Sequence, residues 1–180
     1  EPDTDLATPL PPAEVTAALA RAGLKSAPTG LAHGTVTAIA CHRGFEVTTL
    51  RRDLATDGRH AVVAFDADWR EDAARRDFTI NALSLAPTGE VFDYFGGIAD
   101  LRAGRVRFVG PAARRIAEDT LRILRYFRFH ARYGTGAPDP EALAAIAAAR
   151  AGLAHLSVER VWSELKRPVS YTHLTLPTKA

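Results

Sequence analysis

The amino-acid sequence predicts an α+β protein, in which a short sheet flanked by helices is followed by an all-helical region. Segments rich in β-branched residues, such as "TVTAIA" and "FEVTTL", all lie before residue 110. From about residue 111 onward, apolar residues recur at helical spacing with few interruptions. We therefore expect two domains, residues 1–112 and residues 113–167.

The first domain is expected to begin with a helix and a pair of strands. Two prolines precede apolar positions at helical spacing and Gly23 ends the run, which predicts a helix over 11–23. Strands are expected at 35–41 and 45–50, with a turn at "HRG" between them. The polar segment 51–60 is expected to be a mobile loop. A short strand "AVVAF" and a helical stretch over about 70–85 should follow it.

The remaining elements lead into the helical region. Two short strands, "EVFDYF" and "RVRFVG", should bracket a Gly-Gly turn and a small helix. Helices are expected at 112–133, 139–151 and 157–167, the last with Ser157 as its N-cap. The Ala- and Arg-rich character stops at Arg167, so residues 168–180 are expected to be a non-native tail.

Composition narrows the class of protein. The chain has 180 residues, 47% of them hydrophobic and 24% charged, as in ordinary globular proteins. No apolar run approaches the roughly 18 residues that span a membrane, and no signal-peptide pattern is present. Cys41 is the single cysteine, which excludes a disulfide within the chain and favours a cytoplasmic location. We expect no association with membranes.

The segment "EDTLRILRYFRFHARYG", residues 118–134, carries a ladder of arginines. Arg122, Arg125 and Arg128 lie three residues apart behind Asp119. On an uninterrupted helix these four residues spiral down the face opposite the core. Six basic and two acidic side chains between residues 114 and 132 give a local charge of +4, which suits a polyanionic partner. A solvated helix face is the simpler interpretation of the same pattern.

Aromatic residues are interleaved with the arginines. On the same uninterrupted helix, Ile123 and Phe127 would face the core, whereas Tyr126 and Phe129 would lie among the arginines. Large aromatic side chains are unusual on a solvated face, so another element or a ligand should cover them. Guanidinium groups beside flat aromatic surfaces suit phosphates and bases.

Asp119 and Arg122 together could read the edge of a base. A carboxylate only accepts hydrogen bonds and a guanidinium only donates them. Cytosine and adenine carry an amino donor beside a ring-nitrogen acceptor, whereas uracil and guanine carry a carbonyl where the amino group would be. The pair would thus favour CTP and ATP. A salt bridge between the two residues, one turn apart, is the alternative.

Acidic residues that could hold magnesium occur at several places. Asp3 and Asp5 in "PDTDLAT" lie two apart, so on a strand both carboxylates would point to one face. The same spacing occurs at Asp66 and Asp68 in "FDADW". Glu46 is an acid on a strand otherwise made of β-branched and apolar residues, where an edge or sheet-face charge is the simpler interpretation.

The order of these motifs carries a resemblance to a known family. "DTDLAT", "HGTV", "FEVTTLR", "RRDFTINAL", "DYFGG" and "EDTLRILRYFRF" occur in the order found in class II tRNA nucleotidyltransferases and bacterial poly(A) polymerases. The resemblance covers about residues 1–167, and "HARYG" is most similar to the CCA-adding branch. It implies a polymerase β-like nucleotidyltransferase head with a short sheet, followed by a helical neck.

The resemblance also implies roles for individual residues. Asp3 and Asp5 would be catalytic acids that bind Mg²⁺, with Glu46 a third. Arg76 would contact the nucleotide. The base-reading pair and the rest of the nucleotide and phosphate pocket would be formed by Asp119, Arg122, Arg125 and Arg128.

We therefore expect an enzyme that adds CCA to the 3′ end of tRNA from CTP and ATP by two-metal nucleotidyl transfer. A poly(A) polymerase acting on RNA 3′ ends, and a non-catalytic RNA-binding fragment, are the alternatives. The "GG-x-VRD" segment that the family carries upstream is missing, and so is the helical body that grips tRNA. This chain by itself is expected to be poorly active.

Overall fold

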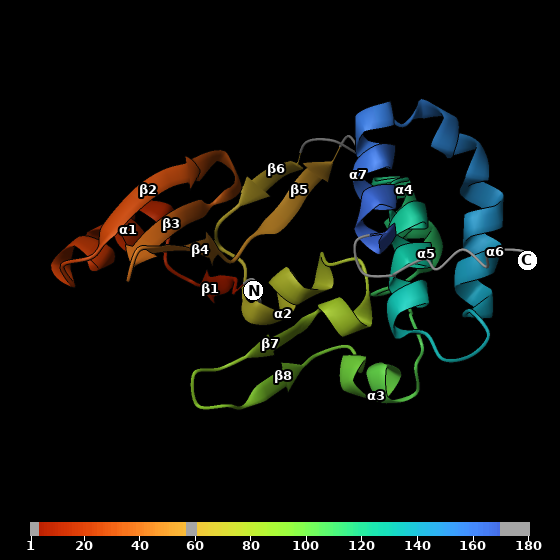
Figure 1. The fold of residues 1–180 in the computed structure, drawn as a ribbon, viewed down its shortest axis with the longest axis horizontal. Coiled ribbons are helices and arrows are strands. Elements are labelled where there is room, and N and C mark those ends of the chain that lie inside the picture. Colours follow the sequence, from red (N-terminus) through yellow and green to blue (C-terminus); the bar gives the residue numbers. More distant parts are fainter. Residues whose placement is uncertain (1–3, 57–60, 170–180) are drawn as a thin grey trace, which may run out of the picture. The chain divides into compact units, whose positions relative to one another are not determined.

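The computed structural model describes residues 4–56 and 61–169, which form two compact units (Figure 1). Unit 1 contains the described residues up to Arg75, and unit 2 contains those from Arg76 onward. The segment between residues 76 and 112, which the sequence analysis assigned to the first domain, packs in unit 2. The domain boundary at 112/113, expected from the change in sequence character, stays a prediction. The division into compact units falls elsewhere, between Arg75 and Arg76.

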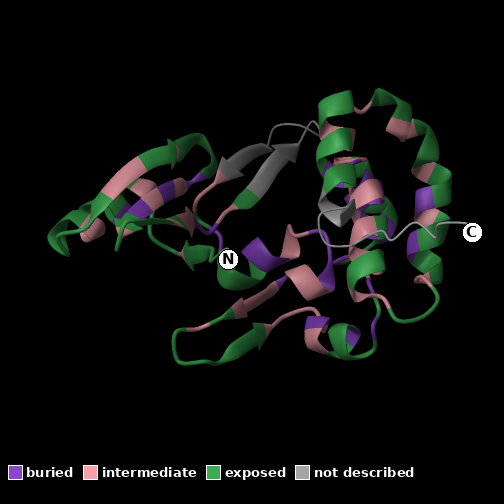
Figure 2. Cartoon of the chain, viewed as in Figure 1, coloured by how far each residue is buried: buried purple, intermediate pink, exposed green. Residues whose placement is uncertain are grey.

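Unit 1 is built around a four-stranded sheet with the strand order β1-β4-β3-β2. The elements of this part are β1 (Leu6–Thr8), α1 (Pro12–Arg21), β2 (Lys25–Gly30), the 3₁₀ helix η1 (Leu31–His33), β3 (Thr35–Ala40) and β4 (Arg43–Thr49). Strand β1 runs parallel to β4, whereas β2, β3 and β4 are antiparallel neighbours. Helix α1 packs against β2, β3 and β4, and buried positions alternate along β3 (Figure 2). One face of the sheet is therefore covered by α1.

Most of this sheet follows the prediction. Helix α1 and strands β3 and β4 confirm the helix over 11–23 and the strands at 35–41 and 45–50. The hairpin turns at Cys41 and His42, whose φ angles of 51° and 61° are those of a type I′ turn. Strand β2 was not predicted. It contains a proline and a glycine, which an edge strand tolerates because one side of it forms no ladder.

The rest of unit 1 is a second hairpin and a short helix. They comprise β5 (Arg52–Thr56), β6 (Ala61–Ala64) and α2 (Trp69–Ala74). Strand β6 confirms the "AVVAF" prediction, but the expected loop over 51–60 is wrong where β5 forms, and residues 57–60 lie outside the described residues. The helical stretch expected over 70–85 is also wrong beyond Ala74, because the chain leaves α2 there and enters unit 2.

Unit 2 combines a small hairpin with helices. Its elements are the 3₁₀ helix η2 (Thr79–Asn81), β7 (Leu83–Leu85), β8 (Val91–Asp93), α3 (Gly97–Arg102), α4 (Ala112–Glu118), α5 (Arg122–Tyr133), α6 (Pro140–Ala149), the 3₁₀ helix η3 (Arg150–His155) and α7 (Val158–Val169). The strand expected at "RVRFVG" is reduced to an isolated bridge between Phe108 and Phe78. The Ser157 hydroxyl accepts from the backbone N–H of Arg160 at 3.5 Å, as expected of an N-cap. None of the helices that the structure describes is both long enough and apolar enough to cross a membrane.

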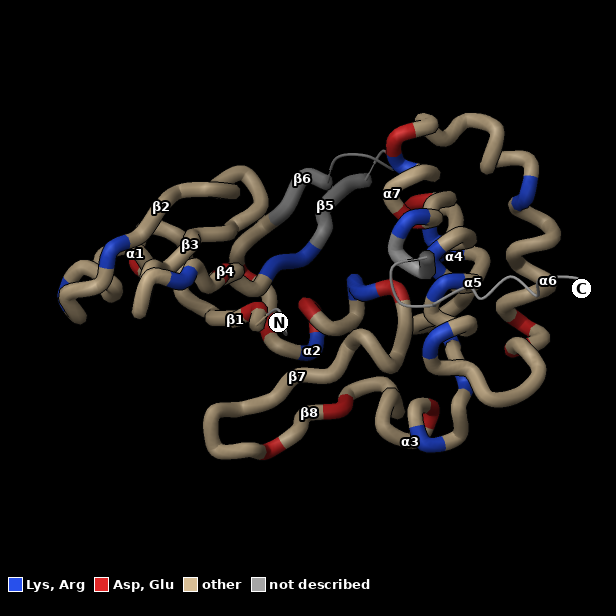
Figure 3. The backbone as a smooth tube through the Cα atoms, in the orientation of Figure 1, with Lys and Arg blue, Asp and Glu red and all other residues tan. Residues whose placement is uncertain are grey.

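The helix expected over 112–133 is interrupted, and the interruption changes which side of it is buried. Asp119 has extended backbone angles (φ −157°, ψ 109°), and its Oδ1 accepts from the backbone N–H of Leu121 at 3.0 Å. This turn ends α4 and starts α5, along which the basic positions follow one another (Figure 3). The core position expected for Phe127 on one uninterrupted helix is wrong, because Phe127 is 47% exposed. Tyr126 is 0% exposed and belongs to the core, which confirms that other elements cover this aromatic residue, although the uninterrupted helix would place it opposite the core.

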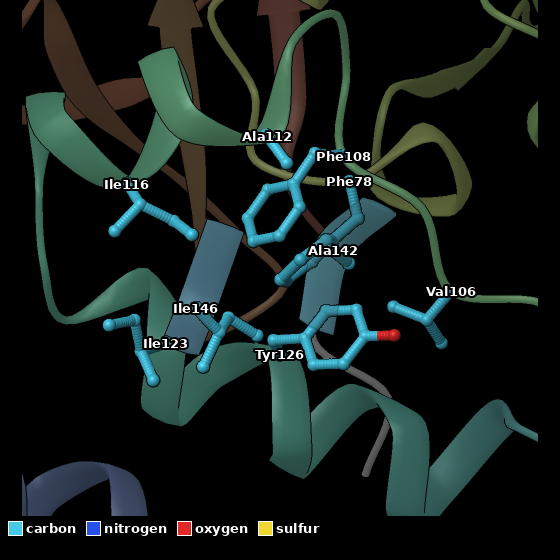
Figure 4. Packing of buried hydrophobic residues seen from close by; sticks show 9 residues of the cluster. All are labelled: Phe78, Val106, Phe108, Ala112, Ile116, Ile123, Tyr126, Ala142 and Ile146. Atoms are coloured by element: carbon cyan, nitrogen blue, oxygen red, sulfur yellow. The ribbon is translucent and has the colours of Figure 1, made fainter. Parts of the chain in front are cut away.

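The core of unit 2 is a cluster of aromatic and aliphatic side chains (Figure 4). Its buried members are Phe78, Val106, Phe108, Ala112, Ile116, Ile123, Tyr126, Ala142 and Ile146. The ring of Phe78 lies 5.0 Å from that of Phe108 and 4.9 Å from that of Phe129, between centroids. Because this core joins the start of unit 2 to α5, it fixes where the arginines of α5 lie.

Candidate active site

Two of the predicted metal-binding acids belong to a pair of parallel strands of unit 1: Asp5 directly precedes β1, and Glu46 lies in β4. Leu6 in β1 pairs with Val47 in β4, and this register, continued by one residue, sets Asp5 level with Glu46. Both acids are exposed, whereas Asp3 lies outside the described residues. Within residues 4–56 and 61–169, no group of three or more His, Cys, Asp or Glu side chains could hold a metal ion. Two carboxylates at one level supply the oxygen ligands that Mg²⁺ prefers, so they fit part of such a site.

The second acidic pair with the same spacing has structural partners. The carboxylate of Asp66 lies 2.7 Å from the guanidinium of Arg52. Asp68 caps α2 by accepting from the backbone N–H of Glu71 at 2.7 Å, and the Glu71 carboxylate accepts from the backbone N–H of Asp68 at 2.9 Å. These contacts form a capping box, which gives Asp68 a role in starting the helix.

Arg125 reaches back to the start of unit 2. Its Nε donates to Oδ2 of Asp77 at 2.6 Å, and Asn81 donates to Oδ1 of the same carboxylate at 2.9 Å. Burial alone would raise the pKa of Asp77, but the charge of Arg125 and these hydrogen bonds outweigh burial and lower it. Burial likewise opposes the charge of Arg125, and Asp77 and Glu164 outweigh it and raise the Arg125 pKa. The ion pair thus stays charged inside the unit.

Arg128 is held by a carboxylate and an aromatic ring. Its Nε donates to Oε2 of Glu164 at 2.7 Å, and its guanidinium carbon lies 4.7 Å from the centroid of the Phe129 ring. The other oxygen of Glu164 accepts from Arg125 Nη1 at 3.4 Å. The side chain of Glu164 is only 5% exposed. A solvated face of arginines, the simpler interpretation of the sequence, is therefore wrong for Arg125 and Arg128.

The predicted base-reading pair lies at the start of α5. Arg122 Nη1 donates to Oε2 of Glu118 at 2.7 Å and to the backbone carbonyl of Arg115 at 3.0 Å. Asp119 Oδ2 accepts from Nη2 of Arg160 at 2.8 Å, while its Oδ1 accepts from a backbone N–H of the turn. The side chain of Asp119 is 25% exposed, so a ligand can reach it.

Arg76, the remaining predicted nucleotide contact, is partly buried directly before Asp77. The structure therefore gathers Arg76, Asp119, Arg122, Arg125 and Arg128 in unit 2, and it describes Asp5 and Glu46 in unit 1. Their functional roles stay predictions.

Sequence reasoning missed three residues that hold this arrangement. Asp77 lies within the motif "RRDFTINAL", but no role was assigned to it, and none was assigned to Arg160 or Glu164. The signal for Glu164 was its place on α7, where it shares the inner side of the helix with the partly buried Val161. An ionised side chain at such a position needs a partner of opposite charge, and the arginine ladder was the unassigned source of one.

Comparison with known proteins identifies the family. Residues 1–107 match the sequence profile of the poly A polymerase head domain. The chain belongs to this family. The resemblance inferred from the order of the motifs is therefore confirmed.

The curated relatives of this chain carry the names of tRNA-processing enzymes. CCA tRNA nucleotidyltransferase 1, mitochondrial, from Mus musculus is 50% identical over 175 residues, which cover 96% of this chain and 40% of the relative. The CCA-adding enzyme of Latilactobacillus sakei is 39% identical over 167 residues, covering 92% of this chain and 41% of the relative. The chain thus spans about 40% of the length of these curated relatives.

A solved structure supports the fold. The Bacillus stearothermophilus CCA-adding enzyme, in complex with CTP, matches with a TM-score of 0.80 and 34% identity, covering 93% of this chain and 39% of that chain. A tRNA nucleotidyltransferase complexed with a primer tRNA and an incoming ATP analog matches with a TM-score of 0.69 and 26% identity, covering 90% and 46%. The predicted α+β nucleotidyltransferase fold is confirmed.

Proposed function

We propose that the full-length protein is a template-independent RNA nucleotidyltransferase that adds CCA, taken from CTP and ATP, to the 3′ end of tRNA. The names of the relatives support this proposal. The structural observation behind it is that four side chains of the predicted nucleotide site each form an ion pair with a described partner: Asp119, Arg122, Arg125 and Arg128. Side chains fixed in this way are preorganised, as a protein template for a base must be.

Base selection would come from Asp119 and Arg122. The carboxylate accepts the amino proton of cytosine or adenine, and the guanidinium donates to the ring nitrogen beside that amino group. Uracil and guanine present a carbonyl to the carboxylate, so two acceptors would face each other without a proton between them. Arg76, Arg125 and Arg128 would bind the rest of the nucleotide and its phosphates.

The transfer itself joins the tRNA 3′-hydroxyl oxygen to the α-phosphorus of the nucleotide and releases pyrophosphate. Asp3, Asp5 and Glu46 would hold Mg²⁺, which when bound lowers the pKa of the attacking hydroxyl and neutralises charge on the phosphates. The residues of this chain position the reactants and compensate charge, so no covalent intermediate with the protein is required.

Base selection is tested in the full-length protein with Asp119→Ala. The unchanged enzyme should incorporate CTP and ATP and reject UTP and GTP. The variant should lose about 10- to 100-fold of that discrimination in kcat/KM, because a missing hydrogen bond to a charged group costs about 1.5–3 kcal/mol. Full discrimination at a normal rate in Asp119→Ala would refute the assignment of Asp119.

The metal-binding assignment is tested with Asp5→Ala and a matched control, Asp66→Ala. Asp5→Ala should abolish transfer while the melting temperature stays unchanged, since an exposed side chain is removed. Asp66 belongs to the pair Asp66 and Asp68, which has the same spacing as Asp3 and Asp5. Asp66→Ala removes only an exposed ion pair with Arg52, so transfer should stay near normal. Equal losses in both variants would contradict the assignment.

A poly(A) polymerase is the second candidate, and the description of the matching head-domain family favours it. Such an enzyme would extend RNA with ATP and leave CTP unused, so parallel incubations with each nucleotide distinguish the two. A non-catalytic RNA-binding module would retain RNA regardless of Asp5. The expected cytoplasmic location stays a prediction, since the name of the mouse relative places that protein in mitochondria.

A further inference from the structure

A buried carboxylate in unit 2 holds two arginines at the protein surface. The side chain of Asp100, in α3, is 0% exposed, whereas those of Arg105 and Arg107 are 50% and 41% exposed. Arg105 Nε donates to Oδ1 of Asp100 at 2.8 Å, and Arg107 Nε donates to Oδ2 at 3.0 Å. A buried carboxylate needs a partner of opposite charge, but one guanidinium group balances it. The second arginine therefore brings a surplus positive charge to the surface.

The surface around these residues is basic. Residues 94–107 carry three arginines and one aspartate, hence a net charge of +2, and their basic positions lie at and just beyond α3 (Figure 3). Arg107 also lines a pocket with two acids at the start of α6. The charge that faces solvent thus comes chiefly from Arg105 and from Arg102, which is exposed at the end of α3. Surplus positive charge on an exposed surface favours a polyanionic partner.

Two aromatic rings adjoin the basic surface. The rings of Phe92 and Tyr94 are stacked, with centroids 6.5 Å apart and planes at 16°, and Phe92 is 37% exposed. Arg107 Nη2 donates to the backbone carbonyl of Phe95 at 3.1 Å, which ties the arginines to the end of the β7–β8 hairpin. The Asp93 carboxylate accepts from backbone N–H groups at the start of α3, so its negative charge is offset locally. An exposed ring beside guanidinium groups suits a base next to phosphates.

We propose that Phe92, Arg102 and Arg105 form an RNA-binding surface outside the candidate active site, an inference that rests on the proposed function. The two arginines contact backbone phosphates of tRNA, and the ring of Phe92 stacks on an unpaired base. Phosphates and the faces of bases are common to all RNA sequences, so the surface adds affinity for tRNA and reads no sequence. The predicted nucleotide pocket uses other side chains, and the choice of CTP and ATP is therefore unaffected.

The experiment measures the Kd of the full-length protein for tRNA that lacks its 3′ CCA, by fluorescence anisotropy at several KCl concentrations. Arg102→Gln and Arg105→Gln should each raise Kd about three- to tenfold at low salt, and should lower the slope of log Kd against log [KCl] by about one. Phe92→Leu should raise Kd about fivefold with the slope unchanged, because stacking releases no counterions. Arg21→Gln, the same change at an exposed arginine of unit 1, is the matched control and should bind tRNA normally.

Kinetic measurements separate this surface from the nucleotide site. In all three variants KM for tRNA should rise, while KM for CTP and for ATP stays unchanged. Arg102 is exposed and Arg105→Gln leaves Asp100 paired with Arg107, so the melting temperature should also stay unchanged. Normal tRNA affinity in the Arg102 and Phe92 variants, or an equal loss in the control, would overturn the surface. If the unchanged enzyme adds no nucleotide to tRNA, the proposed function itself fails, a result separate from the binding data.

Discussion

Replacement of two neighbouring aromatic residues on α5 tests whether the helix lies as the structure has it. Tyr126 is fully buried, with its ring centroid 5.6 Å from that of Phe108 and 6.1 Å from that of Phe78. Its hydroxyl oxygen accepts from the backbone N–H of Asp139 at 3.0 Å. Phe127, the next residue, is 47% exposed. The two positions should therefore differ greatly in their contribution to stability.

The expected magnitudes follow from these contacts. Tyr126→Ala removes a buried aromatic ring and should lower the free energy of unfolding by about 3–5 kcal/mol. Tyr126→Phe removes only the hydroxyl and should cost about 1 kcal/mol, because the backbone N–H of Asp139 loses its acceptor. Phe127→Ala should cost less than about 1 kcal/mol, as substitutions of exposed residues usually do.

The assay is urea unfolding of each variant, followed by far-ultraviolet circular dichroism, which reports chiefly on the helices of unit 2. The order of midpoints should be unchanged protein, Phe127→Ala, Tyr126→Phe and then Tyr126→Ala, with similar slopes in all four. A larger loss for Phe127→Ala than for Tyr126→Ala would refute the reasoning. It would show that residues 112–133 form the uninterrupted helix that the periodicity predicts, with Phe127 in the core.

Three further substitutions test other contacts. Folding lowers the pKa of Asp77, so the stabilising effect of its carboxylate is present above the unfolded pKa and is lost as pH falls through the lower folded pKa. The free energy of unfolding, measured from neutral to acidic pH, should therefore fall less steeply in Asp77→Asn than in the unchanged protein. An identical slope in both would disprove the role of the pairing of Asp77 with Arg125. Gly34→Ala should lower the free energy of unfolding, measured by thermal unfolding, by more than about 2 kcal/mol. The φ angle of Gly34 is +78°, and an added Cβ would lie 2.5 Å from the ring of Phe65. An unchanged stability would contradict this local geometry. Asp93→Ala should cost about 1–3 kcal/mol, because its carboxylate accepts three backbone N–H bonds at the turn into α3; hydrogen exchange that stays slow in this turn would argue against the assignment.

Local patterns were enough to predict many of the elements. Helix α1 and strands β3 and β4 follow from prolines, a glycine and runs of β-branched residues, which act within a few residues of themselves. The break at Asp119 had a local signal as well, because aspartate readily accepts hydrogen bonds from the backbone just beyond it. Hydrophobic periodicity alone predicted one continuous helix, because apolar residues recur at helical spacing on both sides of Asp119.

The partners of the arginines could not be predicted in the same way. Arg125 and Arg128 were identified as functional candidates from their spacing, but their carboxylate partners come from other elements. Asp77 and Glu164 are brought to α5 by the packing of unit 2. The place of Glu164 on its helix called for a basic partner, but the sequence did not show which arginines it would meet. The motif order located the residues of the candidate site, whereas only the fold shows what holds them.

The long sequence separation of these ion pairs has a consequence for how the protein folds as it is synthesised. Asp77 pairs with Arg125 across 48 residues, Asp119 with Arg160 across 41, and Arg128 with Glu164 across 36. Helix α5 leaves the ribosome before α7, so its arginines exist for a time without Arg160 and Glu164 beside them. During that interval their charge would attract nucleic acid of any sequence, in a salt-dependent manner. Asp119, Arg125 and Arg128 gain their partners on α7 only when this last helix docks, so an incompletely folded chain would meet RNA before these side chains are fixed.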